Sequence, residues 1–262
     1  METRDMSRWE TGICEVVSGD GEEEIIVRGQ RLSELIGKVG FAEMMCLMLR
    51  GDLPGAAEAR VLDALLVASM EHGIAPPSMI SRCFASYGTS IQAAVGGGIL
   101  AFGDRMGGLG EQLAKAMVEK IGERDPHSLS DDALRAAARE IVAESRARGE
   151  RLPGFGIPLH GADPRAPKVL EVARAEGTFG AYGKLGGFLE EELAAARGGR
   201  AVPMNLDGVG ACVILDLGFP WQSTRLFLLT PRSVSMGAHY LEEQSQDTIW
   251  RHLPADTIRY RR

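Results

Sequence analysis

The chain has 262 residues, of which 45% are hydrophobic and 25% charged, a composition typical of a soluble globular protein. Its formal net charge of −7 argues against nucleic acid as the main partner, and no run approaches the roughly 20 apolar residues of a membrane span. The opening METRDMSRWE has no apolar signal-peptide core, so we expect a cytoplasmic protein without a membrane partner.

The N-terminal quarter of the chain predicts a hairpin followed by helices. Residues 14–31 contain two short β-like runs around a glycine turn. From Ser33 the spacing becomes helical, and we expect that helix to end at Gly40. Phe41–Leu49 predicts a densely apolar helix that ends before a glycine, and residues 57–70 predict another.

The rest of the chain also predicts helices. Ser90–Phe102 is apolar all round and rich in small residues, so we expect a central buried helix. Asp131–Arg148 is charged and amphipathic, and Pro231–Gln244 predicts a long helix. Residues 153–230 are richer in glycine and proline and resemble a smaller helical subdomain. The fold class is therefore mostly α, with a large helical domain (1–150 and 231–262) interrupted by a small one (151–230).

Three segments place ionisable side chains at turns marked by glycine or proline. They are Glu71–Gly73, Gly154–Arg165 and Asn205–Gly208. Together they supply histidine, carboxylate and arginine, which suit proton transfer beside a carbonyl with an anion clamp nearby. The alternative is that these side chains have purely structural roles. A histidine would then be a packing residue, and Asp207 would be the N-cap of a helix that starts at Val209.

These segments resemble the active-site segments of the citrate synthase superfamily, in the expected order. Gly154–Arg165 is similar to the family's glycine-rich loop that ends in Asp-Pro-Arg, and Asn205–Gly208 is similar to the Asn-Val-Asp-Gly segment of its citryl-CoA lyase branch. Gly103–Gly108 (GDRMGG) looks like the citryl-CoA lyase branch, which includes the lyase domain of ATP-citrate lyase. Met106 there takes the place of a catalytic histidine of true synthases. The resemblance implies a citrate synthase-like fold.

The resemblance also implies roles for individual residues. Asp207 matches the aspartate that handles the proton at the acyl α-carbon, and His72 matches a histidine that contacts the substrate hydroxyl or a carboxylate. Arg165 and Arg232 match the arginines that clamp substrate carboxylates. The chain departs from the family at Ile157, where a second catalytic histidine is expected.

His160 follows that departure by three residues on the same loop. It either replaces the missing histidine, polarising the hydroxyl or ketone oxygen, or belongs to a variant for another substrate. In the second case Ile157 marks a less polar pocket. The sequence leaves both open.

The resemblance further implies that the substrate is a CoA thioester and that an oxo acid is one of the products. Basic residues stand where lyase relatives keep theirs, namely Arg148, Arg151, Arg197 and Arg200. The five histidines show no metal-ligand spacing, so no metal is expected. Family precedent and the small-residue helix favour a homodimer.

The predicted function is therefore a citryl-CoA lyase-like reaction that yields acetyl-CoA and an oxo acid. Two alternatives stay open. One is an enzyme of the same fold that acts on a different 3-hydroxyacyl-CoA or runs in the condensing direction. The other is a non-catalytic protein that binds CoA or carboxylates.

Overall fold

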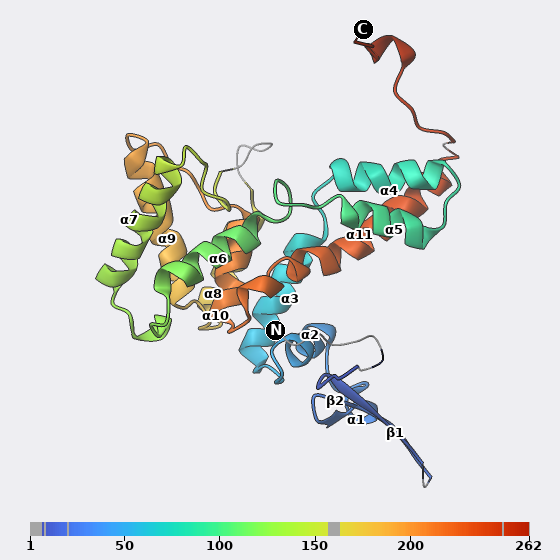
Figure 1. The fold of residues 1–262 in the computed structure, drawn as a ribbon, viewed down its shortest axis with the longest axis horizontal. Helices are drawn as coiled ribbons and strands as arrows, with labels where there is room; N and C mark the ends of the chain where they lie inside the picture. The colour runs from blue at the N-terminus through green and yellow to red at the C-terminus, as the bar shows by residue number, and fades with distance from the viewer. Residues whose placement is uncertain (1–6, 8, 20, 157–162, 248, 262) are drawn as a thin grey trace. The chain divides into compact units, whose positions relative to one another are not determined.

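The computed structural model describes residue 7 and residues 9–19, 21–156, 163–247 and 249–261. The chain divides into two compact units, Met1–Arg60 and Val61–Arg262, which are described separately. Helices dominate the described residues (Figure 1), so the mostly α fold class is confirmed. The predicted domain boundaries near residues 150 and 231 stay a prediction.

The first unit contains a small antiparallel sheet. Its strands β1 (Cys14–Gly19), β2 (Glu22–Val27) and β3 (Gln30–Arg31) lie in the order β1-β2-β3. The predicted hairpin is confirmed, and a third short strand extends it. This extension depends on Arg28 and Gly29, whose φ angles of 48° and 78° reverse the chain in two residues.

Three helices begin in the first unit. α1 (Leu32–Leu35) is shorter than predicted, because the chain turns at Gly37, where φ is 81°. α2 (Phe41–Leu49) has the predicted bounds, and α3 (Ala56–Met70) begins one residue before its predicted start. One hydrophobic cluster of this unit consists of the buried residues Val27, Leu35 and Leu47.

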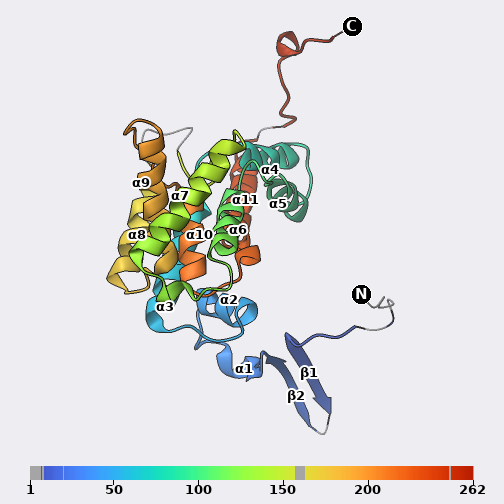
Figure 2. The ribbon, with the colours of Figure 1, turned by 60° about the vertical axis from the view of Figure 1, so that its left-hand side comes forward.

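In the second unit, α4 (Pro76–Ser86), α5 (Ile91–Leu100) and α11 (Leu226–Ser245) pack against one another (Figures 1 and 2). The prediction that α5 is a central buried helix is wrong for this chain. Only its Ala94 and Gly98 are buried, and Leu100 is 85% exposed. Small residues bring α5 close to its neighbours on one side, and its other side carries exposed apolar residues.

The remaining helices of this unit form a second group. α10 (Leu206–Asp216) is buried along most of its length and packs on α6 (Leu109–Ile121), α8 (Arg165–Ala175) and α9 (Ala181–Ala196). α7 (Asp131–Ala147) is amphipathic as predicted and packs its apolar face on α9. Short 3-10 helices cover Pro126–Ser128, Trp221–Ser223 and Ala255–Thr257.

α11 begins earlier than the sequence suggests. A proline commonly opens a helix, which led to a predicted start at Pro231. The backbone is already helical before it, since the amide of Leu229 donates to the carbonyl of Arg225 at 3.0 Å. Ser233 does not cap the helix, because its hydroxyl donates to the carbonyl of Thr230. Among the described residues, no helix has the length and apolar character to cross a membrane.

Candidate active site

The position of Asp207 is set by two glycine-containing turns, at residues 154–156 and 205–208, that lie against each other. The amide of Asn205 donates to the carbonyl of Gly154 at 3.0 Å, and the amide of Gly156 donates to that of Pro203 at 2.8 Å. A Cβ atom on Gly208 would lie only 2.3 Å from the Gly154 oxygen. Glycine is therefore required at position 208, and the glycine-rich loop docks directly against the first turn of α10.

Asp207 is not the helix cap. The cap is Asn205, whose side-chain oxygen accepts from the amide of Gly208 at 3.1 Å, so the N-cap interpretation of Asp207 is wrong. Within the described chain, no hydrogen bond reaches the Asp207 carboxyl. Burial raises the pKa of this carboxyl, against the opposing effect of Arg165 and Arg232. Asp207 therefore retains its proton at a higher pH than an ordinary aspartate.

Arg165, at the start of α8, is held by its own chain. Its Nε and Nη2 donate to both oxygens of Asp163, at 2.9 and 2.7 Å. Its Nη1 reaches the carbonyls of Ala68 and Glu71 at 3.3 and 3.5 Å. The hydrogen bonds from Arg165 hold the pKa of Asp163 below its usual value, and the charge of His72 adds to this. The predicted clamp thus ties the end of α3 to α8.

Arg232 has a different environment. Its side chain is only 9% exposed, and desolvation lowers the pKa of its guanidinium, against the opposing effects of Glu71 and Asp207. Its Nε is buried and has no hydrogen-bond partner among the described residues. Its Nη1 lies 3.8 Å from Glu71 Oε1. Arg232 therefore has donors to spare for a ligand carboxylate.

Sequence reasoning missed three residues that meet in this region. The hydroxyl of Ser235 donates to Glu71 Oε2, and His239 Nε2 lies 3.3 Å from the same oxygen. Glu71 stands inside the segment Glu71–Gly73 that was singled out, and His239 follows Arg232 by seven residues on α11. Their pairing had no sequence signal, but the spacing of Arg232, Ser235 and His239 along one helix face could have suggested a common role.

Of the two predicted catalytic histidines, only His72 lies among the described residues. His72 directly follows Glu71, whose Oε1 accepts from the His72 amide at 2.7 Å, and its imidazole is close enough to affect the pKa of Asp163. His160 and Ile157 lie outside the described residues. Electrostatic effects thus link Asp207 to Arg165 and Arg232, and they link His72 to Asp163, the partner of Arg165.

The four arginines proposed for CoA lie at the ends of two parallel helices. Lys184 pairs with Asp131 at 3.0 Å, and Arg139 with Glu192 at 3.0 Å, so α7 and α9 run side by side in the same direction. The helices therefore bring their C-terminal ends to the same side. The exposed residues at these ends include Arg148, Arg151, Arg197 and Arg200.

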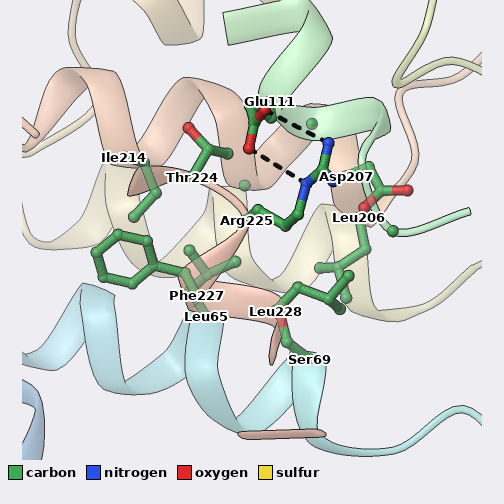
Figure 3. A pocket seen from close by; sticks show the side chains of 13 residues that line it. Leu65, Ser69, Glu111, Leu206, Asp207, Ile214, Thr224, Arg225, Phe227 and Leu228 are labelled. Carbon is green, nitrogen blue, oxygen red and sulfur yellow. Dashed lines mark hydrogen bonds and ion pairs between the residues drawn. The ribbon is translucent and has the colours of Figure 1, made fainter. Parts of the chain in front are cut away.

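A small cavity of about 40 Å³ adjoins this site (Figure 3). Asp207 and several apolar side chains line it, together with an ion pair in which Arg225 Nε lies 3.2 Å from Glu111. Arg225 also donates to Asp104 at 2.8 Å. Because Asp104 belongs to the GDRMGG loop, this arginine tethers that loop, and with it Met106, to the start of α11.

Comparison with known proteins decides the family. Residues 54–253 match the family model "Citrate synthase, C-terminal domain". The chain belongs to the citrate synthase family. Its relatives include the 2-methylcitrate synthase of Mycobacterium tuberculosis, 28% identical over 83% of this chain and 53% of that protein. Another is the putative citrate synthase 2 of Mycobacterium bovis, 30% identical over 73% and 49%. The chain spans about half the length of these relatives.

Solved structures of the citrate synthase family share the fold. The citryl-CoA lyase of Hydrogenobacter thermophilus has a TM-score of 0.83 and 30% identity, covering 97% of this chain and 94% of that one. The ATP citrate lyase of Methanothrix soehngenii, solved with citrate and coenzyme A, has a TM-score of 0.78 and 20% identity. That match covers 99% of this chain and 42% of the larger enzyme. The predicted citrate synthase-like fold is confirmed.

Proposed function

We propose that this chain is a citryl-CoA lyase-like enzyme that cleaves a 3-hydroxyacyl-CoA to acetyl-CoA and an oxo acid. The observation that carries the proposal is its similarity to a citryl-CoA lyase over nearly the full length of both chains. The loop with Met106 agrees, because a thioether cannot donate the hydrogen bond that a synthase histidine gives to the acetyl-CoA enol. Loss of one such donor typically costs a synthase about 10²–10³ in rate.

The reaction breaks one carbon–carbon bond. A base takes the proton of the 3-hydroxyl, the oxygen becomes the carbonyl of the oxo acid, and the bonding electrons pass to the α-carbon of the thioester. Asp207 then donates its proton to that carbon. The raised pKa of the Asp207 carboxyl supports this role, because the acid has to be protonated when the enolate forms.

Other residues bind and orient the substrate. Arg232 holds a substrate carboxylate, and His72 contacts the hydroxyl or a carboxylate. His160 takes the place of the family histidine at the hydroxyl oxygen. The basic ends of α7 and α9 bind the phosphates of CoA, for which arginine is well suited.

We also propose a cytoplasmic homodimer. The exposed apolar residues of α5 and α11, among them Leu100, Val234 and Leu241, support a second copy as the covering partner. Light scattering at micromolar concentration is expected to give twice the chain mass, and a monomeric mass would contradict the dimer.

A second candidate is condensation rather than cleavage. The curated relatives with 28–30% identity are synthases, which favours this direction. In that case Asp207 removes the α-proton of acetyl-CoA, and the same residues bind the oxo acid.

The test is to incubate the purified protein with citryl-CoA and to follow acetyl-CoA by mass spectrometry. The proposal predicts release of acetyl-CoA and oxaloacetate in equal amounts. If citryl-CoA is instead hydrolysed to citrate and CoA, and acetyl-CoA with oxaloacetate also yields citrate and CoA, the second candidate replaces the first. A panel of other 3-hydroxyacyl-CoA thioesters identifies a different acyl group, and no reaction with any of them contradicts both candidates.

A further inference from the structure

Three side chains on one face of α11 converge on a single carboxylate. Arg232, Ser235 and His239 are spaced i, i+3 and i+7, so they project from the same side of the helix. The hydroxyl of Ser235 donates to Glu71 Oε2, and His239 Nε2 lies 3.3 Å from that oxygen. Arg232 Nη1 lies 3.8 Å from Oε1. Glu71 is thus surrounded by cationic or hydrogen-bonding groups of one helix face.

The orientation of His239 is fixed from behind. Arg82 Nε donates to His239 Nδ1 at 3.1 Å, and because a guanidinium only donates, the imidazole proton must be on Nε2. Arg82 is itself held by Glu243, a fully buried carboxylate that accepts from Arg82 Nη1 at 2.7 Å. Nε2 is therefore the donor nitrogen of His239. It lies 3.3 Å from Glu71 Oε2 without a hydrogen bond to it, and Arg82 fixes the ring before any ligand arrives.

Glu71 fills the position next to these donors imperfectly. The nitrogens Arg232 Nε and His239 Nε2 are buried without a hydrogen bond to any described residue. A separation of 3.8 Å is also too long for a hydrogen bond between Arg232 Nη1 and Glu71. A carboxylate in better register would satisfy donors that Glu71 leaves unused, and unmade hydrogen bonds of buried donors are costly.

Burial separates the fixed groups from the movable one. The side chains of Arg232 and His239 are 9% and 12% exposed, whereas that of Glu71 is 47% exposed. Glu71 follows the end of α3, beside Gly73, whose φ of 76° makes a turn. The Glu71 side chain can therefore rotate into solvent without disturbing a helix, while the donors of α11 stay in place.

We propose that Arg232, Ser235 and His239 form a binding site for a carboxylate of the substrate, which Glu71 fills when no ligand is bound. The ligand class follows from the occupant, a planar carboxylate whose two oxygens face donors of α11. Ser235 and His239 are then substrate-binding residues in addition to Arg232. The inference rests on the proposed function only for the identity of the acyl group, because the carboxylate site needs no turnover to be measured.

The experiment measures binding of succinate by calorimetry, with inorganic phosphate as a comparison ligand. Glu71→Gln removes the competing charge and leaves the shape, so this variant is expected to bind succinate about tenfold tighter than the wild type. Ser235→Ala is expected to bind it severalfold more weakly. Unchanged or weaker binding by Glu71→Gln would overturn the proposal, as would equal affinity for phosphate and succinate.

A matched pair of variants tests His239. The amide of glutamine superimposes on Nε2 of the imidazole, and that of asparagine on Nδ1. His239→Gln keeps a donor toward the carboxylate and is expected to bind succinate within about threefold of the wild type, whereas His239→Asn keeps only the contact with Arg82 and is expected to lose about tenfold. Thermal unfolding of both variants controls for the fold. A purely structural histidine predicts equal affinities for the two, which would also overturn the proposal.

The outcome is separable from that of the proposed function. If the protein binds succinate as described but cleaves no CoA thioester, the carboxylate site is supported and the lyase assignment is contradicted. A protein that cleaves citryl-CoA while Glu71→Gln leaves succinate affinity unchanged retains the lyase assignment and loses this site.

Discussion

Two carboxyl groups of the candidate site, Asp207 and Glu71, have opposite environments. Burial raises the pKa of Asp207, whose carboxyl accepts no hydrogen bond from the described residues. Burial would also raise the pKa of Glu71, but hydrogen bonds from Ser235 and the amide of His72 outweigh it and lower the net pKa. One group is therefore suited to carry a proton and the other to remain an anion.

The difference shows that the environment of a carboxyl group determines whether it serves as an acid or as an anion. Pairs of titratable groups with pKa values pushed apart commonly identify an acid and its counterpart. Asp207 stands at the start of a buried helix without a partner, so it can give a proton to carbon. Glu71 faces the donors of α11, so it occupies an anion site. Neither group is suited to be the base for the substrate hydroxyl.

The largest effect is expected for Asp207→Asn. The amide keeps the shape of the side chain but cannot carry the proton, so kcat for carbon–carbon cleavage should fall by about 10³–10⁴. Binding of the CoA thioester should stay within a few fold, which calorimetry can check. Wild-type turnover by this variant would remove Asp207 from the mechanism.

His160→Ala tests which group accepts the hydroxyl proton, since Asp207 and Glu71 are both unsuited. If His160 replaces the family histidine, its loss should reduce the cleavage rate by about 10²–10³. Ile157→His, made in the wild-type background, should then gain little. A His160→Ala variant with normal rates, together with faster citryl-CoA cleavage by Ile157→His, would instead indicate that position 157 determines the substrate.

Glu243→Gln disturbs the support of the Glu71 side and leaves the Asp207 side intact. Its carboxylate is fully buried and accepts from Arg82 at 2.7 Å and from Arg251 Nη2 at 2.9 Å. Removing that charge leaves the buried Arg82 with Glu242 as its remaining carboxylate partner and takes a partner from the exposed Arg251, so the free energy of unfolding should fall by about 1–3 kcal/mol. The control is Glu150→Gln, which breaks the exposed pair with Arg148 and should cost about 0–1 kcal/mol. Equal denaturation midpoints for the two variants would contradict this.

The smallest effect concerns the stability of Asp207→Asn. The pKa of Asp207 in the folded chain lies above its ordinary value of 3.8, so the folded state binds this proton more tightly than the unfolded state. Stability is therefore lost as the pH rises from that value through the folded pKa. The variant escapes this loss and should be more stable than the wild type at neutral pH by on the order of 1 kcal/mol. Denaturant titrations should show the gain shrinking toward pH 3, and a gain that is independent of pH would contradict the raised pKa.

Much of the fold was predictable because its signals are local. The hairpin and helices α2 and α3 follow from period, glycine and capping residues that are adjacent in sequence. The exposure of α5 was not predictable. An apolar pattern indicates that a helix surface tends to be buried, but it does not indicate which element covers that surface. The start of α11 was missed because Pro231 gives the local signal of a helix start, whereas here it lies in the second turn of a helix that begins at Leu226.

The site shows the same division. The resemblance indicated Asp207, which stands in the short motif Asn205–Gly208, and it indicated Arg232 as well. The contacts of Glu71 with His239 and of Arg82 with Glu243 join segments far apart in the chain, and nothing local specifies them. Asp163 and Arg165 are close in an Asp-Pro-Arg sequence, so a contact between them could be suspected. The hydrogen bonds between their side chains become apparent only in the fold.

The most direct test of the division between the two carboxyl groups is hydrogen exchange at the methyl group of acetyl-CoA. The protein is incubated with acetyl-CoA in deuterated water, and deuterium uptake is followed by mass spectrometry. The wild type and Glu71→Gln should both incorporate deuterium, because Asp207 alone moves the proton at that carbon, and Asp207→Asn should incorporate none above the rate without protein. Equal incorporation by Asp207→Asn and the wild type, or loss of exchange in Glu71→Gln alone, would contradict the assignment.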